Sequence, residues 1–204
     1  AIYSGYIIDK SDKKKLLHYS IAGNLVLTIL FTYITSEHAL MSFSKPSILI
    51  CIYIIAFLTG IARAFSGPTS FALVSMLVPK EELPNATSWH SSSWQIAAVT
   101  GPAIGGLLYG EKGITFAFAT MIVMLSTSVL VLFFIKSKPP VVVLNREPML
   151  KSIQEGIKFV WQSKDILGVL SLDLFAVFFG GATALLPYFS DQILNTGAEG
   201  LGIL

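Results

Sequence analysis

The sequence predicts an all-α membrane protein, and three observations point to that fold class. Hydrophobic residues make up 53% of the 204 residues. Charged residues make up only 13%, whereas soluble domains carry about 25%. The mean hydropathy is +0.71, and the apolar residues fall in blocks of about 20 or more, the length a helix needs to cross a bilayer. A multi-span helical bundle is therefore expected.

Five complete spans are predicted, with the end of an earlier span at residues 1–8 and the start of a later one after residue 200. The complete spans are expected at residues 16–35, 48–78, 85–109, 114–135 and 166–189. The short links between them are expected at residues 9–15, 36–47, 79–84, 110–113 and 190–200. Because the chain begins with Ala and ends as a new apolar run starts, we interpret it as a piece of a longer protein.

The longest polar segment, residues 136–165, has internal order. Pro139 and Pro140 are expected to stop the preceding helix. Apolar residues then recur at helical spacing, and they are Leu150, Ile153, Ile157, Val160 and Trp161. Such an amphipathic helix suits the cytoplasmic interface of a membrane, with Trp161 at the level of the headgroups. Packing against other cytoplasmic loops is an equally good explanation.

The placement of Lys and Arg predicts the orientation of the chain, because cytoplasmic loops carry an excess of these residues. Of the 14 Lys and Arg residues, 11 fall in loops on one side of the predicted spans. Only Lys45 and Lys112 fall on the other side, and Arg63 lies within a span. The Lys-rich loops are therefore expected to be cytoplasmic, in a multi-pass protein of a cell (inner) membrane, and a bacterial one.

Arg63 is the strongest functional candidate. It lies near the middle of residues 48–78, an almost wholly apolar stretch. Roughly 15 helical residues on either side leave no nearby interface for its charge to reach. An intramembrane Arg therefore faces a partner or water. Pro68 follows five residues later and is expected to kink this helix.

Three short patterns resemble signatures of the major facilitator superfamily. The first is a loop signature of glycine, three residues, aspartate, a basic residue, two residues and two basic residues, matched by Gly5, Asp9, Lys10, Lys13 and Lys14. Asp12 stands where the family usually has glycine. The resemblance implies that Asp9 belongs to a charge cluster that latches one conformational state.

The second pattern resembles the fourth-helix signature of the family, an arginine followed by a polar residue and a glycine, here Arg63, Ser66 and Gly67. Its arginine is associated with proton coupling or with substrate charge. The third pattern resembles the fifth-helix signature of the family's antiporters, matched by Gly101, Pro102, Gly105 and Gly106. Glycines at four-residue spacing let helix backbones approach closely, and Pro102 adds a bend. Ordinary small-residue packing is the alternative explanation.

The order of these patterns identifies the chain as resembling a major facilitator-type bundle from the end of helix two to the start of helix eight. Residues 79–86 and 173–187 resemble the enterobactin-exporter and macrolide-efflux branch. The resemblance implies three regions. Residues 1–135 belong to the N-terminal six-helix half, residues 136–165 are a cytoplasmic linker, and residues 166–204 start the C-terminal half.

Further polar residues lie at membrane depth. Asp173 is interpreted either as a proton carrier or gate residue, or as a salt-bridging or headgroup-level carboxylate. Trp94 and Gln95 suit a cavity for amphiphilic substrates. Such groups more often bond between helices. Asn24 has the same two explanations, with packing favoured, and His18 and His90 are interpreted as interface histidines.

The predicted function is therefore a secondary active transporter, specifically a proton-coupled exporter (antiporter) of amphiphilic small molecules such as drugs or siderophores. Proton-coupled metabolite uptake by a symporter of the same fold is the alternative. An intramembrane enzyme built on His90 and residues 91–93 is disfavoured, because adjacent helical residues do not face each other. Expected partners are the lipid bilayer, a small-molecule substrate and protons. No nucleic acid, cofactor or metal is expected, and the full-length protein is expected to be a monomer.

Overall fold

The computed structural model describes residues 5, 7–9, 11–135, 149–180, 185–196 and 200. The regular elements in these residues are all helical. In chain order they are α2 (Lys13–Ile34), α3 (Glu37–Ser42), α4 (Lys45–Leu77), η1 (Lys80–Glu82), α5 (Leu83–Phe134), α6 (Met149–Gln162), α7 (Lys164–Phe179), α8 (Leu186–Tyr188) and η3 (Phe189–Ile193). Within the described part of the chain, α2, α4 and α5 are long and apolar enough to cross a bilayer. The predicted class, a partial multi-span helical bundle, is confirmed.

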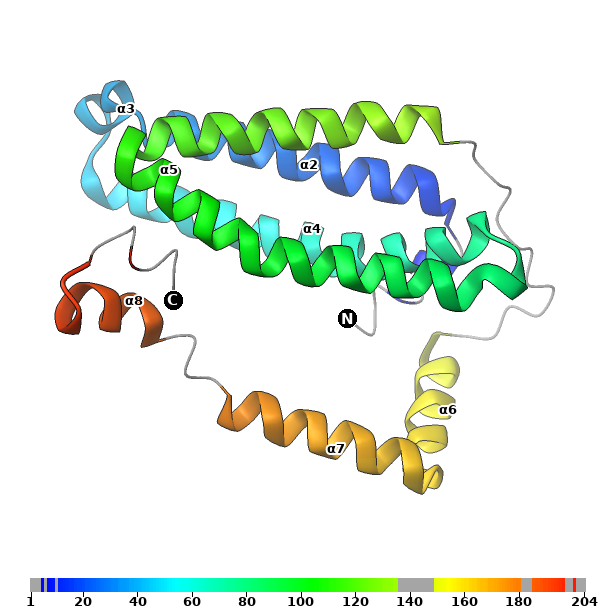
Figure 1. Cartoon of the computed structure of the whole chain (residues 1–204). Coiled ribbons are helices and arrows are strands. Elements are labelled where there is room, and N and C mark those ends of the chain that lie inside the picture. Colours follow the sequence, from blue (N-terminus) through cyan, green and yellow to red (C-terminus); the bar gives the residue numbers. More distant parts are fainter. Residues whose placement is uncertain are drawn as a thin grey trace.

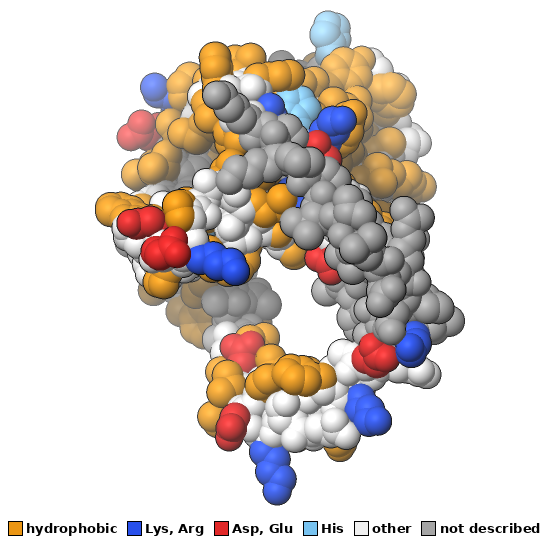
Figure 2. All heavy atoms as spheres, turned by 90° about the vertical axis from the view of Figure 1, so that its right-hand side faces the viewer, with side chains coloured by type: hydrophobic (Ala, Val, Ile, Leu, Met, Phe, Trp, Pro, Cys, Tyr) orange, Lys and Arg blue, Asp and Glu red, His pale blue; other side chains and the backbone are white. Residues whose placement is uncertain are grey.

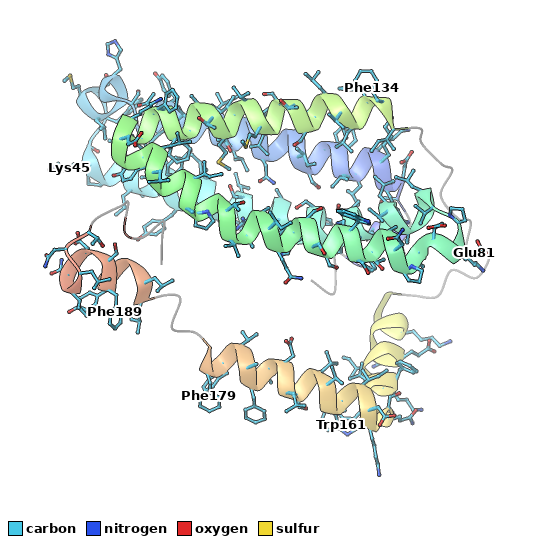
Figure 3. All side chains as sticks on the ribbon, viewed as in Figure 1. Lys45, Glu81, Phe134, Trp161, Phe179 and Phe189 are labelled. Carbon is cyan, nitrogen blue, oxygen red and sulfur yellow. The ribbon has the colours of Figure 1, made fainter. Side chains whose placement is uncertain are left out.

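The bundle consists of α2, α4 and the two arms of α5, which lie side by side in Figure 1. Leu17 of α2, Leu73 of α4 and Leu132 of α5 form its buried core at one end. Figure 3 shows Glu81 and Phe134 at this end and Lys45 at the other. Most large apolar side chains remain exposed, as expected for surfaces that face lipid or further helices.

The start of α2 differs from the prediction, because Lys13 to Lys15 belong to the helix and not to a preceding turn. Asp12 caps the helix, and its carboxylate accepts hydrogen bonds from the backbone N–H groups of Lys14 (3.0 Å) and Lys15 (3.2 Å). An aspartate at this position satisfies donors that the helix leaves without partners. The cap explains why this chain folds with Asp12 where the resemblance leads one to expect glycine.

Residues 36–47 are also more ordered than the predicted polar link. They contain the short helix α3 and the first turn of α4, in which Pro46 occupies a position that needs no backbone donor. α4 then continues for 33 residues, about 50 Å, with Pro68 inside it. The η1 turn replaces the charged loop predicted at residues 79–84, and α5 begins directly after it.

The reversal between the two arms of α5 is sharper than the four-residue turn predicted at residues 110–113. Helix continues to Lys112, and Gly113 alone leaves the helical conformation, with φ 81° and ψ 172°. This backbone region is open to glycine and strained for other residues. One glycine therefore divides α5 into a first arm, residues 83–112, and a second arm, residues 114–134 (Figure 1).

The amphipathic helix predicted around residues 150–161 is present as α6. The span predicted at residues 166–189 is not continuous. α7 ends at Phe179, and its 16 residues reach about 24 Å, less than the ~30 Å hydrocarbon core. The amide of Gly180 closes α7 on the Ala176 carbonyl, and the chain resumes as the short turns α8 and η3.

Candidate functional site

Arg63 lies deep in the apolar part of α4. The helical rise places it about 27 Å from Lys45 and about 21 Å from Leu77. Its side chain is exposed, and among the described residues its guanidinium has no hydrogen-bond or ion-pair partner. Its carbonyl accepts a 3.4 Å hydrogen bond from the Ser66 hydroxyl. The charged group is therefore not enclosed by the helices that pack against α4.

A contact two turns further along α4 shows which side of the helix carries Arg63. Ser70 lies seven residues after Arg63 and so on the same side of the helix. Its hydroxyl is 3.1 Å from Nε2 of His90 in the first arm of α5. The His90 ring also meets Phe71 edge to face, with 6.0 Å between ring centroids. Arg63 thus lies on the side of α4 that turns toward α5.

Trp94 extends the same surface on α5, because it follows His90 by one helical turn. Its side chain is 67% exposed, and Gln95 beside it is exposed as well. We call the surface formed by Arg63, Ser66, Ser70, His90 and Trp94 the α4–α5 strip. It is held together at the Ser70–His90 end and open at the Arg63 end, so it can line a space that α4 and α5 border.

The predicted latch loop makes contacts that its sequence pattern did not specify. Lys13 is buried, and its Nζ donates to the backbone carbonyls of Asp9 (2.7 Å) and Ser11 (3.2 Å). Lys14 Nζ donates to the Phe133 carbonyl at the end of α5 (3.3 Å). The Asp9 carboxylate is exposed and has no partner among the described residues, while Lys10 lies outside them. Figure 2 shows basic and acidic side chains together at this end of the bundle.

Two glycines of the predicted fifth-helix pattern, Gly101 and Gly105, are not in close contact with a neighbouring helix. No atom comes within 4 Å of a Cβ placed at Gly101 or Gly105, and the same holds for Gly67 and Gly5. Pro102 lies within the first arm of α5 without ending it, and Gly106 is half-buried. The close backbone approach expected at Gly101 and Gly105 is therefore absent within the described residues.

Asp173 is exposed in the middle of α7, and no described residue pairs with it. The extensive contacts of α7 among the described elements are with α6, so Asp173 is not brought to the α4–α5 strip. Among the described residues, no group of His, Cys, Asp and Glu side chains is placed to hold a metal ion.

Sequence reasoning missed the Ser70–His90 contact and treated His90 as an interface histidine. Ser70 precedes the η1 turn and His90 follows it by a similar number of residues. In a hairpin of two helices such residues lie at the same height, and this could have predicted the contact. It also missed the link from Lys14 to the Phe133 carbonyl, which joins elements 119 positions apart. Nothing local in the sequence indicates that second contact.

Comparison with known proteins gives a consistent family. A family model described as Major Facilitator Superfamily matches residues 1–204. The chain is 25% identical to macrolide efflux protein A of Enterococcus faecalis, covering 94% of this chain and 58% of that protein. It is 24% identical to macrolide efflux protein A of Streptococcus pyogenes, with 94% and 46% covered. It is 28% identical to the staphyloferrin A transporter of Staphylococcus aureus, with 100% and 50% covered.

The chain thus spans about half the length of the curated relatives that it matches. No solved structure matches it.

Proposed function

The chain belongs to the Major Facilitator Superfamily, and from that premise we propose that it is part of a proton-coupled exporter of amphiphilic small molecules. Drugs and siderophores are the proposed substrate classes. The names of the similar proteins, two macrolide efflux proteins and a staphyloferrin A transporter, support export of this kind. The proposed location is a bacterial cell membrane, with the Lys-rich end of the bundle in the cytoplasm.

The position of Arg63 carries this proposal. A guanidinium about 20 Å or more from either end of an apolar helix cannot stably face lipid. Its exposed side chain must therefore meet water or polar groups in the assembled protein, beyond the helices that pack on α4 in this chain. An aqueous space at membrane depth is what alternating access requires, because substrate sites in such folds lie near the midplane.

The proposed mechanism is a rocking of two helical halves around a midplane site, driven by proton binding to a buried carboxylate. Proton binding can shift the equilibrium only if the two states differ in proton affinity. Arg63 would lower the proton affinity of this carboxylate in a state where the two groups are close, and would no longer do so in a state where they are apart. Asp173 is the candidate carboxylate of this chain, because it lies within the apolar part of α7.

The test is efflux from cells that express the intact protein with Arg63→Ala. We expect efflux to fall to the background of cells without the transporter while the protein remains in the membrane. Lys112→Ala is the matched control, because it also removes one exposed cation from a long helix, and it should leave efflux unchanged. Full efflux with Arg63→Ala would remove this residue from the mechanism.

Proton coupling and direction need separate measurements. Collapse of the proton gradient should abolish efflux by the unmodified protein if protons drive export. In inverted membrane vesicles an exporter accumulates substrate, whereas a symporter that takes up metabolites does not. Accumulation only in right-side-out vesicles would favour the symport alternative.

A further inference from the structure

A line of polar side chains runs along the interior side of α2. Ser20, Asn24, Thr28 and Thr32 recur every four residues and therefore lie on one face. Ser20 and Thr28 are buried, and the other two are half-buried. The Thr28 hydroxyl donates to the Asn24 carbonyl and the Thr32 hydroxyl to the Thr28 carbonyl, each at 2.8 Å. The hydroxyls of Thr28 and Thr32 therefore have hydrogen-bond partners within α2 itself.

Two buried oxygens near this line have no hydrogen-bond partner. They are Oδ1 of Asn24 in α2 and Oγ1 of Thr69 in α4. Thr69 is 0% exposed, so bulk solvent does not reach it. A buried polar group without a partner costs about 1–3 kcal/mol, and native structures rarely leave such groups unsatisfied. Each of these two atoms is therefore expected to have a hydrogen-bond partner in the folded protein.

The packing of α2 on α4 brings these two groups to nearly the same height. The helices run antiparallel, and Leu17 meets Leu73 in the buried core. One turn beyond Leu17 lies Ser20, and one turn before Leu73 lies Thr69. Asn24 follows one turn further along α2. Ser20, Asn24 and Thr69 thus lie within about one turn of one another, roughly 5 Å along the bundle axis, where α2 packs on α4.

We propose that this group is a binding site for a buried water molecule between α2 and α4. The water donates to Asn24 Oδ1 and bonds to the Thr69 hydroxyl, with Ser20 as its third partner. Buried waters typically make about three hydrogen bonds to otherwise unsatisfied groups. All three side chains are neutral, and a bound cation would demand more oxygen ligands, commonly at least one carboxylate. Water is therefore the ligand that fits.

The site has a structural consequence for α4. Pro68 precedes Thr69 and has no N–H, so it leaves the Ala64 carbonyl without its helical partner. The water joins Thr69, the residue directly after Pro68, to α2 by hydrogen bonds. It thereby holds the part of α4 that carries Arg63 in a fixed position on its neighbour.

The first test measures the melting temperature of the intact protein with Thr69→Val, Asn24→Leu and both together. Each single change loses the water and leaves the other group buried without a partner, so both single variants should melt below the unmodified protein. The double variant has neither Asn24 Oδ1 nor Thr69 Oγ1, so neither oxygen is left buried without a partner. It should therefore melt above either single variant. Thr28→Val is the matched control, because Thr28 is also buried but its hydroxyl bonds within α2. It should show no such coupling with Thr69→Val.

The second test detects the water itself by hydroxyl-radical footprinting of the intact protein. X-ray radiolysis of a bound water produces radicals locally. Ile21, which packs against the buried core, and Leu73 within that core should therefore be oxidised in the unmodified protein and protected in the double variant. Coupling without oxidation would show a direct Thr69–Asn24 hydrogen bond and overturn the proposal. Oxidation without coupling would show water that these residues do not hold, and would overturn it too.

Discussion

The Ser70–His90 hydrogen bond joins α4 to α5 within the α4–α5 strip, and its removal should weaken that junction. Ser70→Ala is expected to lower the free energy of unfolding by about 0.6 kcal/mol, the average for hydrogen bonds between membrane helices. Thermal unfolding in detergent measures the effect. Ser75→Ala is the control, because its hydroxyl bonds within α4 to the Ala72 carbonyl (2.9 Å). Equal losses in both variants would mean that the contact does not join the helices.

Asp12 offers a second prediction at the residue scale. Its carboxylate caps α2, so Asp12→Ala should cost about 1 kcal/mol of unfolding free energy. Asp12→Ser keeps a side-chain acceptor and should retain most of the stability. Asp12→Gly, the residue expected from the family pattern, should fall between them. If the serine variant were as unstable as the alanine variant, Asp12 would act by its charge and not as a cap.

At the scale of elements, Gly113 decides how the second arm of α5 returns along the bundle. A side chain at φ 81° is strained, so Gly113→Ala should destabilise the protein by about 1 kcal/mol or more. Gly23→Ala is the control, because Gly23 is helical in α2 and no atom lies within 4 Å of an added Cβ. That variant should be neutral or more stable by up to about 1 kcal/mol. Thermal unfolding of the pair separates backbone strain from a general effect of alanine.

The elements also show what sequence reasoning can and cannot supply. Hydropathy predicted the apolar helices, because an apolar segment inside a bilayer must pair its backbone N–H and C=O groups with each other, and a helix does so. It misplaced their ends at Lys13, Lys45 and Phe179, because single residues at these ends, such as Asp12 before α2 and Pro46 in the first turn of α4, fix where a helix begins or stops. The period of residues 150–161 predicted α6, since an amphipathic face repeats with the helical turn.

The candidate site was predictable only in part, for a reason that belongs to the whole molecule. The exceptional depth of Arg63 is visible in the sequence, because a charge stands out in an apolar stretch. Its neighbours are not visible, because Ser70 and His90 meet only through the packing of two helices. Among the described residues, no atom lies within 4 Å of a Cβ placed at Gly101 or Gly105, and the Arg63 side chain is exposed. Their partners depend on the assembled protein.

The orientation of the whole molecule gives the last prediction. Lys13–Lys15 at the start of α2, η1 and the end of α5 lie at one end of the bundle, and Lys45 lies at the other (Figure 3). Because positive residues remain on the cytoplasmic side during insertion, the first end should face the cytoplasm. Glu81 and Glu111 are exposed acidic residues, one in η1 and one beside Gly113, and they form a matched pair for labelling.

With exposed Cys51 replaced by serine, Glu81→Cys and Glu111→Cys each leave a single thiol in the chain. A membrane-impermeant maleimide should label Glu111→Cys in intact cells, and should label Glu81→Cys only after the cells are permeabilised. The opposite pattern would show that the Lys-rich end of the bundle faces outward. Labelling of both thiols in intact cells would show that the protein inserts in both orientations, and that the positive residues at the Lys-rich end do not determine a single one.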